Sequence, residues 1–197
     1  MSTLPRGLYG MLDVAPGEPD QAVIDRARFL VDHGVLAVQL RAKHHTVEAV
    51  GRIAARLVSV APRLIVNDHV EIARELGAWV HLGQSDGPDP ADLHRAGLPY
   101  GRSTHTLDQV ADADHACYVG FGPVFATNTK ATGYSPRGLL ALAAAVRTSR
   151  VPVVAIGGIH VGNIDAVRAT GVHAWAPISG FWDNRADEAA LRRLLSC

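Results

Sequence analysis

The sequence has few cysteines, no excess of charge of either sign and no long apolar run, and each absence excludes a class of protein. Only Cys117 and Cys197 are present, which is too few for a disulfide framework or a cysteine-rich metal site. Lys plus Arg and Asp plus Glu each number 19, so the formal net charge is 0. We therefore expect neither a nucleic-acid-binding protein nor one that binds anionic membranes, and any anion site must come from a local cluster.

The apolar stretches are also too short for a membrane span, and the first residues, MSTLPRGLYG, lack the apolar centre of a secretion signal. These features favour the cytoplasm as the location. What the sequence does contain is an ordinary globular mixture, with 48% apolar and 19% charged residues in 197. That length is enough for one sizeable core, so a single domain over 1–197 is expected.

Short apolar runs alternate with amphipathic segments along the whole chain. Within 18–33, for example, Val23, Ala27 and Leu30 recur at helical spacing. The runs predict strands at 8–13, 35–41, 63–68, 79–83, 100–104, 117–122, 151–158 and 173–179. The intervening segments predict helices near 18–33, 46–60, 69–76, 89–96, 106–112, 136–148, 161–170 and 183–195.

This alternation predicts the fold class. Strands that are apolar on both faces and separated by helices are typical of a parallel α/β sheet. Eight strand–helix units of about 25 residues each, joined by short connections, predict closure into a compact (β/α)8 TIM barrel. An open, doubly wound sheet is the alternative architecture.

Polar and glycine residues gather where the predicted strands end, which is the end that carries the chemistry in such barrels. Seven of the eight strands show this signal, and the opposite strand ends show no comparable cluster. In chain order the residues are Gln39, Arg41 and Lys43; Asn67 and Asp68; Gln84 and Asp86; Ser103 and His105; Thr127, Thr129 and Lys130; Gly157 and Gly158; Ile178 and Ser179. This distribution indicates an enzyme.

Two different anion sites are expected at this end. The glycine pair after the seventh strand, together with backbone N–H groups at Ile178 and Ser179, suits a phosphate group. Pro177 cannot contribute an N–H group there. The alternative is that Gly157 and Gly158 only form a tight turn.

The second expected site is cationic, with Arg41, Lys43 and Lys130 beside the hydroxyls of Thr127 and Thr129. Two carboxylates that end neighbouring strands could share a Mg²⁺ ion there, and these belong to Asp68 and Asp86. A metal-bound diphosphate between the cations and carboxylates would explain the combination. The alternative is a set of surface ion pairs.

The histidines do not have the spacing of a zinc site. His81 lies within a strand and is expected to be a packed, hydrogen-bonded core residue, whereas His105 lies beside Ser103 and has either a ligand-binding or a structural role. A phosphate at one site and a metal-bound diphosphate at the other would mean two phosphorylated small-molecule substrates. Group transfer with diphosphate as the leaving group is the chemistry that this pair predicts.

Six motifs resemble those of the thiamine-phosphate synthase family, in the family's order and over nearly the whole chain. They are QLRAK at 39–43, Asn67-Asp68, VHLGQSD at 80–86, STHT at 103–106, GPVFATNTK at 122–130 and VVAIGGI at 153–159. The resemblance implies that the enzyme joins 4-amino-5-hydroxymethyl-2-methylpyrimidine diphosphate to hydroxyethylthiazole phosphate, or its carboxylated form, and releases diphosphate. It also implies a dissociative mechanism, in which a pyrimidine carbocation forms before the thiazole nitrogen captures it, and a homodimer.

The resemblance further implies a role for each matching residue. Gln39 and Ser103 would contact the aminopyrimidine, while Asp68 and Asp86 would hold Mg²⁺. The diphosphate would be bound by Arg41, Lys43, Asn67, Thr129 and Lys130. The thiazole phosphate would lie by Thr127 and be held by Gly158, Ile178 and Ser179. Arg41, Lys43, Ser103 and Lys130 are the expected catalytic residues.

Some positions depart from the family pattern: Ala42, His44, Ser85, Pro177 and Trp182. The related thiazole tautomerases share part of the motif set, so an isomerase with His105 as its proton carrier is the second hypothesis. A non-catalytic thiamine-phosphate-binding protein is the third. The carboxylate pair and the Thr-x-Thr-Lys element at 127–130 favour the synthase.

Overall fold

The computed structural model describes residues 3–126, 135–177 and 188–195. Its eight strands are parallel and pair in chain order, with β1 returning to β8, so the sheet is a closed barrel. The strands are β1 (Gly7–Asp13), β2 (Ala37–Arg41), β3 (Leu64–Asn67), β4 (Trp79–Leu82), β5 (Tyr100–Thr104), β6 (Tyr118–Phe121), β7 (Val153–Ile156) and β8 (Ala174–Ala176). The predicted (β/α)8 barrel is confirmed, and the open sheet is excluded.

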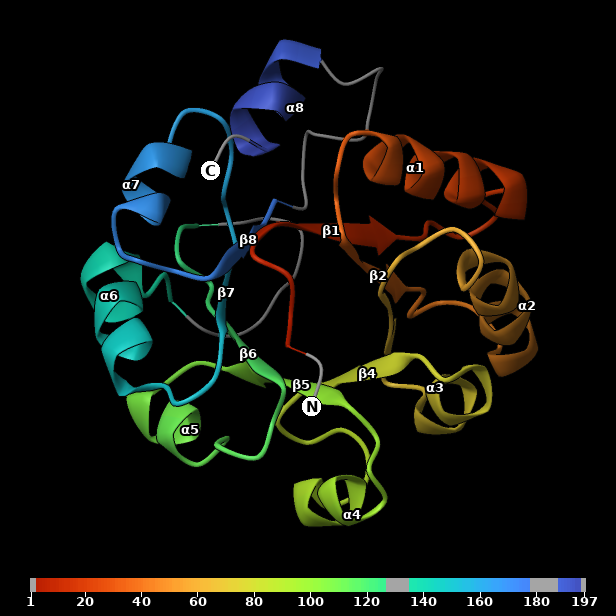
Figure 1. Ribbon diagram of the computed structural model, residues 1–197, viewed down its shortest axis with the longest axis horizontal. Coiled ribbons are helices and arrows are strands. Elements are labelled where there is room, and N and C mark those ends of the chain that lie inside the picture. Colours follow the sequence, from red (N-terminus) through yellow and green to blue (C-terminus); the bar gives the residue numbers. More distant parts are fainter. Residues whose placement is uncertain (1–2, 127–134, 178–187, 196–197) are drawn as a thin grey trace.

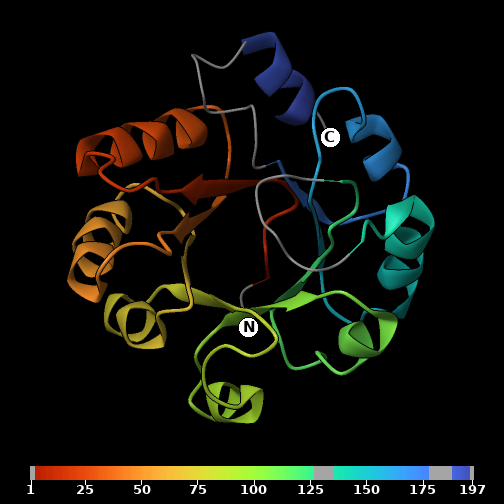
Figure 2. The same ribbon diagram turned by 180° about the vertical axis from the view of Figure 1, so that it is seen from behind.

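A ring of helices surrounds the barrel, one after each strand (Figure 1), and the view from behind shows the same ring (Figure 2). They are α1 (Asp20–Asp32), α2 (Val47–Leu57), α3 (Val70–Leu76), α4 (Pro90–Arg95), α5 (Leu107–Ala111), α6 (Gly138–Thr148), α7 (Ile164–Arg168) and α8 (Glu188–Leu195). Over the described ranges, none of these helices has the length and apolar character needed to cross a membrane.

The predicted elements are found, but most are shorter than their apolar patterns. The seventh strand was predicted over 151–158 and covers Val153–Ile156. It ends there because Gly157 and Gly158 adopt φ values of 97° and 65°, outside the extended region of a strand. The pattern over 161–170 likewise contains a helix only at Ile164–Arg168. Apolar residues in the flanking turns also pack on the core, so periodicity alone extends each element too far.

Alternation along the strands divides the apolar residues into two cores. Side chains directed outward pack under the helices, as Val38 and Leu40 of β2 do. Those directed inward fill the barrel: Leu4, Tyr9, Met11, Ala37, Ile65, Trp79, Tyr118, Val154, Ala174 and Ala176. The barrel is therefore packed at its centre and not hollow.

Tyr118 is the largest of the fully buried side chains in the described part of the chain, and it requires a glycine on the neighbouring strand. Gly101 pairs with Tyr118 in the β5–β6 register. A Cβ atom at Gly101 would lie 2.0 Å from Tyr118 Cζ, so the tyrosine ring occupies the space that any larger residue would need. The ring also stacks on Trp79 and His81 of β4, with centroid distances of 6.3 and 5.5 Å.

Candidate active site

A pocket opens at the carboxyl ends of the strands, above this inner core. It collects side chains from all eight strands or the turns that follow them, which agrees with the rule for (β/α)8 barrels. The described residues that line it are Tyr9, Met11, Gln39, Arg41, Lys43, Asn67, Asp68, His81, Gly83, Asp86, Ser103, Tyr118, Gly120, Val154, Ile156 and Ala176. Gln39, Arg41 and Lys43 all face it, as their alternation along β2 predicts.

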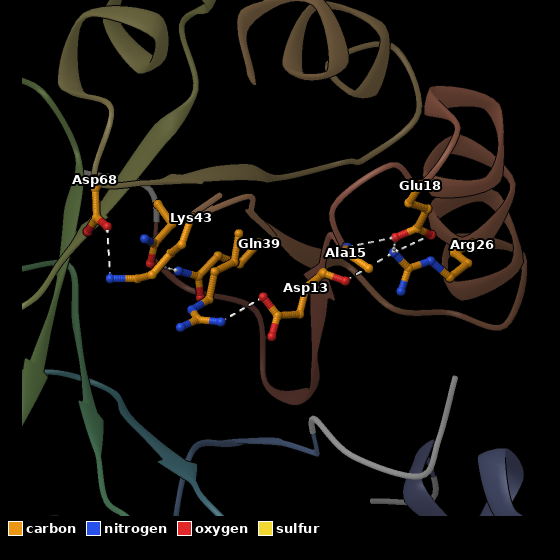
Figure 3. Close-up of polar contacts among 9 residues, drawn as sticks. Asp13, Ala15, Glu18, Arg26, Gln39, Lys43 and Asp68 are labelled. Carbon is orange, nitrogen blue, oxygen red and sulfur yellow. Dashed lines mark hydrogen bonds and ion pairs between the residues drawn. The ribbon is translucent and has the colours of Figure 1, made fainter. Parts of the chain in front are cut away.

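One side of the pocket carries two cation–carboxylate pairs. Arg41 Nη1 lies 2.6 Å from Asp13 Oδ1, and Lys43 Nζ lies 3.2 Å from Asp68 Oδ2. Figure 3 shows the Lys43 side chain directed toward Asp68 and Asp13 facing the neighbouring strand. Each cation is held by one carboxylate and keeps further N–H groups for an anion, because Arg has five donors and Lys three.

The backbone at Asp68 is strained. Its φ angle is 67°, and it is the only non-glycine residue with a positive φ in the described part of the chain. Its N–H donates to the carbonyl of His81, 2.9 Å away, which holds this conformation. Aspartate accepts the left-handed region more readily than most residues do, and strain of this kind concentrates at functional sites.

A second carboxylate faces the same pocket from the turn after β4. Asp86 Oδ2 accepts a hydrogen bond from the N–H of Gly83 at 3.2 Å. A Cβ atom at Gly83 would lie 2.2 Å from that oxygen, so glycine is needed for the carboxylate to lie there. Within the described ranges no group of three or more His, Cys, Asp or Glu residues is close enough to hold a metal. Asp68 and Asp86 thus provide two carboxylates, the number that Mg²⁺ commonly takes from a protein.

The other side of the pocket is neutral and hydrogen-bonded. Gln39 Nε2 donates to Asn67 Oδ1 at 2.8 Å, and both residues are almost fully buried. His81 Nε2 lies 2.9 Å from Ser103 Oγ. His81 is hydrogen-bonded as expected, but its assignment to the core was wrong: it lines the pocket, because inward residues near a strand's carboxyl end face the opening.

Sequence reasoning missed two residues that line the pocket, Tyr9 and Tyr118, and also Asp13, whose carboxylate pairs with Arg41 of the pocket. Asp13 ends β1 opposite Arg41, and the same strand-end rule could have found it. The tyrosines lie inside apolar runs that look like ordinary core. Burial raises the pKa of both phenols far above the usual value, so both remain protonated.

The glycine pair after β7 packs against the segment that follows β6. A Cβ atom at Gly157 would lie 2.6 Å from Pro123 Cβ, and one at Gly158 would lie 2.6 Å from the carbonyl oxygen of Ala126. The N–H of Phe125 also donates to the carbonyl of Gly157 at 3.0 Å. The turn therefore needs glycine for its conformation and its packing, and its role in binding a phosphate stays a prediction.

Several predicted site residues are not brought to the pocket or lie outside the described residues. Gly158 and His105 are not among the described residues that line it. His105 instead uses Nδ1 to contact the carbonyl oxygen of Gly122 at 2.6 Å. Five others lie outside the described residues: Thr127, Thr129, Lys130, Ile178 and Ser179.

Two departures from the family pattern leave the described pocket unchanged. Ala42 alternates with Arg41 and Lys43 and so points outward, where it is buried in the core beneath the helices. Ser85 is exposed and does not line the pocket. Neither position supplies a pocket group in this chain.

The model of a protein family described as "Thiamine monophosphate synthase" matches residues 11–181. The chain belongs to this family. A curated thiamine-phosphate synthase from Anaeromyxobacter dehalogenans is 37% identical, with 96% of this chain and 88% of that protein covered. Another, from Neisseria meningitidis serogroup A, is 41% identical over 76% of this chain and 78% of its own length.

A solved structure of a similar protein has the same fold. Thiamine phosphate pyrophosphorylase from Pyrococcus furiosus superposes with a TM-score of 0.82 at 29% identity, covering 95% of this chain and 93% of that one. The resemblance found in the motifs is therefore confirmed, and the chain is an enzyme of the thiamine monophosphate synthase family.

Proposed function

We propose that this enzyme transfers the pyrimidinylmethyl group of 4-amino-5-hydroxymethyl-2-methylpyrimidine diphosphate to the ring nitrogen of hydroxyethylthiazole phosphate, giving thiamine phosphate and diphosphate. One observation carries the proposal. A single pocket places Arg41 and Lys43, with the carboxylates of Asp68 and Asp86, beside the uncharged Gln39 and Ser103. A charged half and a neutral half are what a diphosphate ester of a heterocycle requires.

The reaction breaks the bond between the methylene carbon and the diphosphate oxygen, and the electron pair leaves with the diphosphate. The thiazole nitrogen then donates its lone pair to the methylene carbon and forms the new C–N bond. In the dissociative order, the bond to diphosphate breaks first. This cleavage needs no protein nucleophile and depends on stabilising the negative charge of the departing diphosphate. Arg41 and Lys43 would supply that stabilisation, with Lys130 added from the segment that follows β6.

The carboxylates of Asp68 and Asp86 fit a divalent cation. Both face the pocket, and Asp68 is held in position by a strained backbone and by Lys43. They would hold Mg²⁺, which when bound neutralises charge on diphosphate oxygens. The residues themselves would orient the diphosphate, since Lys43, which pairs with Asp68, would also contact the anion.

The neutral half would hold the pyrimidine ring, with Gln39 and Ser103 at its polar edge and Asn67 between ring and diphosphate. Apolar side chains that line the pocket, including Met11, Val154 and Ile156, would exclude water from the methylene carbon. That exclusion matters because water would otherwise capture the cation. For the thiazole phosphate we propose the turns after β7 and β8, with Thr127, Gly158, Ile178 and Ser179.

The test is product formation from the two substrates, with and without Mg²⁺. We expect magnesium-dependent thiamine phosphate and an equal amount of diphosphate. Asp86→Asn keeps an oxygen that can accept from Gly83, yet removes the charge. It should lower kcat/KM by on the order of 100-fold and raise the Mg²⁺ concentration needed for half-maximal rate.

Lys130→Ala should lower kcat/KM by on the order of 100-fold as well, for loss of one charge-stabilising group. Arg28→Ala, which changes an exposed residue on α1, is the matched control for loss of a cation and should retain full activity. No product from folded protein would contradict the proposal, and the carboxylated thiazole phosphate would then be assayed for isomerisation. We also propose a homodimer located in the cytoplasm, which sedimentation and cell fractionation would test.

A further inference from the structure

Six pocket side chains form one continuous hydrogen-bonded chain across the inside of the barrel. Besides the Gln39–Asn67 and His81–Ser103 contacts, three bonds connect the two ends. Tyr9 donates its hydroxyl proton to Gln39 Oε1 at 3.2 Å, the two tyrosine hydroxyls lie 2.7 Å apart, and Tyr118 Oη lies 2.8 Å from His81 Nδ1. The two tyrosine hydroxyls are therefore the middle of the chain.

The number of protons decides the direction of each bond. Gln39 Oε1 can only accept, and the residue is only 2% exposed, so it depends on a protein donor. Tyr9 has a single hydroxyl proton and gives it to that oxygen. The contact between the two tyrosines then requires Tyr118 to donate to Tyr9.

The same count of protons decides the direction of the bond between Tyr118 and His81. Tyr118 has given its one proton to Tyr9, so at His81 it can only accept. His81 must therefore carry its proton on Nδ1. When the ring is neutral, Nε2 carries the lone pair, and Ser103 Oγ donates its proton to that nitrogen.

We propose that the Tyr9–Tyr118 pair is a positioning device, which fixes His81 as the Nδ1–H tautomer and thereby makes Ser103 a pure hydrogen-bond acceptor toward the pocket. At the other end, Gln39 uses one N–H on Asn67 and keeps the second for a ligand. The hydrogen-bonded chain thus presents one donor to the pocket, at Gln39, and one acceptor, at Ser103. Resting on the proposed function, we infer that this order selects an amino group on the pyrimidine, which donates to Ser103, over an oxo group, which cannot.

The fold holds the central tyrosine of this chain firmly in place. Tyr118 is clamped between the backbone at Gly101 and the stacked rings of Trp79 and His81. Tyr9 packs against it at a centroid distance of 5.7 Å. This packing keeps the Tyr118 oxygen beside His81 Nδ1, so we expect the tautomer to be a property of the folded enzyme without substrate.

The first experiment therefore uses the protein without substrates. Long-range ¹H–¹⁵N spectra of the histidine rings distinguish the two tautomers, and the His81 signals are identified by their loss in His81→Gln. We expect His81 in the wild-type protein to be the Nδ1–H form. An Nε2–H form would overturn the proposal, whatever the protein's activity, so this result is independent of the proposed function.

Two variants then test the role of the tyrosines. Tyr118→Phe removes the acceptor at His81 Nδ1 and should move the His81 signals toward the Nε2–H form. Tyr100→Phe is the matched control, because Tyr100 is also a buried strand tyrosine but does not line the pocket. It should leave the His81 signals unchanged. Unchanged signals in Tyr118→Phe would overturn the positioning role.

The recognition consequence has a separate readout. We expect Tyr118→Phe to lower the preference for the 4-amino over the 4-oxo pyrimidine diphosphate, measured as the ratio of kcat/KM values, by about tenfold, the factor that one ordinary hydrogen bond supplies. Tyr100→Phe should keep the wild-type ratio. An equal loss on both substrates in Tyr118→Phe would show a merely structural role and overturn the inference about selectivity.

Discussion

The amine of Lys43 lies 3.2 Å from the carboxylate of Asp68, at a residue whose backbone has a φ of 67°. The pair joins the rim of β2 to the turn after β3, so it fixes a cation and an anion on one edge of the pocket. Both side chains are about one-third exposed, at 34% and 30%. Water therefore weakens their mutual attraction, and the pair matters chiefly for the position of its charges.

Asp68→Asn should separate charge from backbone strain. Asparagine accepts a positive φ as readily as aspartate, so the free energy of unfolding should hardly change, whereas kcat/KM should fall by on the order of 100-fold. Asp68→Ala should lose similar activity and also about 1–2 kcal/mol of stability, since alanine is strained in this region. Urea unfolding and steady-state kinetics measure the two effects, with exposed Asp25→Asn as the control. Equal stability of the two variants would contradict the strain argument.

Asp13 is expected to orient Arg41. In Asp13→Asn the arginine keeps a neutral acceptor but loses the charged partner at 2.6 Å. We expect the KM for the pyrimidine diphosphate to rise by up to about tenfold, with a smaller change in kcat, because a partly exposed pair contributes modestly. Steady-state kinetics at low and high salt provide the measurement. An unchanged KM accompanied by a lower melting temperature would instead assign the pair to stability alone.

Gly101→Ala should destabilise the barrel and disturb the pocket together. The new methyl group would collide with the Tyr118 ring, and overpacking of this kind costs about 1–3 kcal/mol. Gly51→Ala on α2 is the matched control. Its Cβ atom would meet only Ile72 Cδ1 at 3.8 Å, so a gain of up to about 1 kcal/mol in helix stability is expected. Urea unfolding measures the change in the free energy of unfolding for each variant. Equal changes in both variants would contradict the close approach of the Tyr118 ring.

Stability should fall at alkaline pH. Burial raises the pKa of Tyr9 and Tyr118 in the folded protein, whereas in the unfolded chain a tyrosine titrates near its ordinary value of about 10. Below that value the stabilisation is fully present. Above it the unfolded chain binds fewer protons, so each buried tyrosine lowers the free energy of unfolding by about 1.4 kcal/mol per pH unit. Tyr118→Phe should show a shallower decline between about pH 9 and 11. An identical slope would contradict this account.

The catalytic face was predictable from the sequence because of a simple geometric rule. Parallel strands bring their carboxyl ends to one rim, so the sequence alone places Gln39, Asn67 and Ser103 together. His81 was misassigned because its position within a strand does not show whether its side chain lies in the inner core or lines the pocket. Asp13 was missed although the same rule applies to it, because a single aspartate at a strand end belongs to no distinctive motif.

Local sequence alone determined the alternating strands and helices, since period-2 and period-3.6 apolar patterns reflect only which faces are buried. It also determined the family, because six ordered motifs are specific together. What tertiary structure decided is how those residues pair: Lys43 with Asp68, Arg41 with Asp13, and the tyrosine hydroxyls with Gln39 and His81. Such contacts depend on barrel closure and strand register, where residues more than a hundred positions apart, as Tyr9 and Tyr118 are, meet at hydrogen-bonding distance.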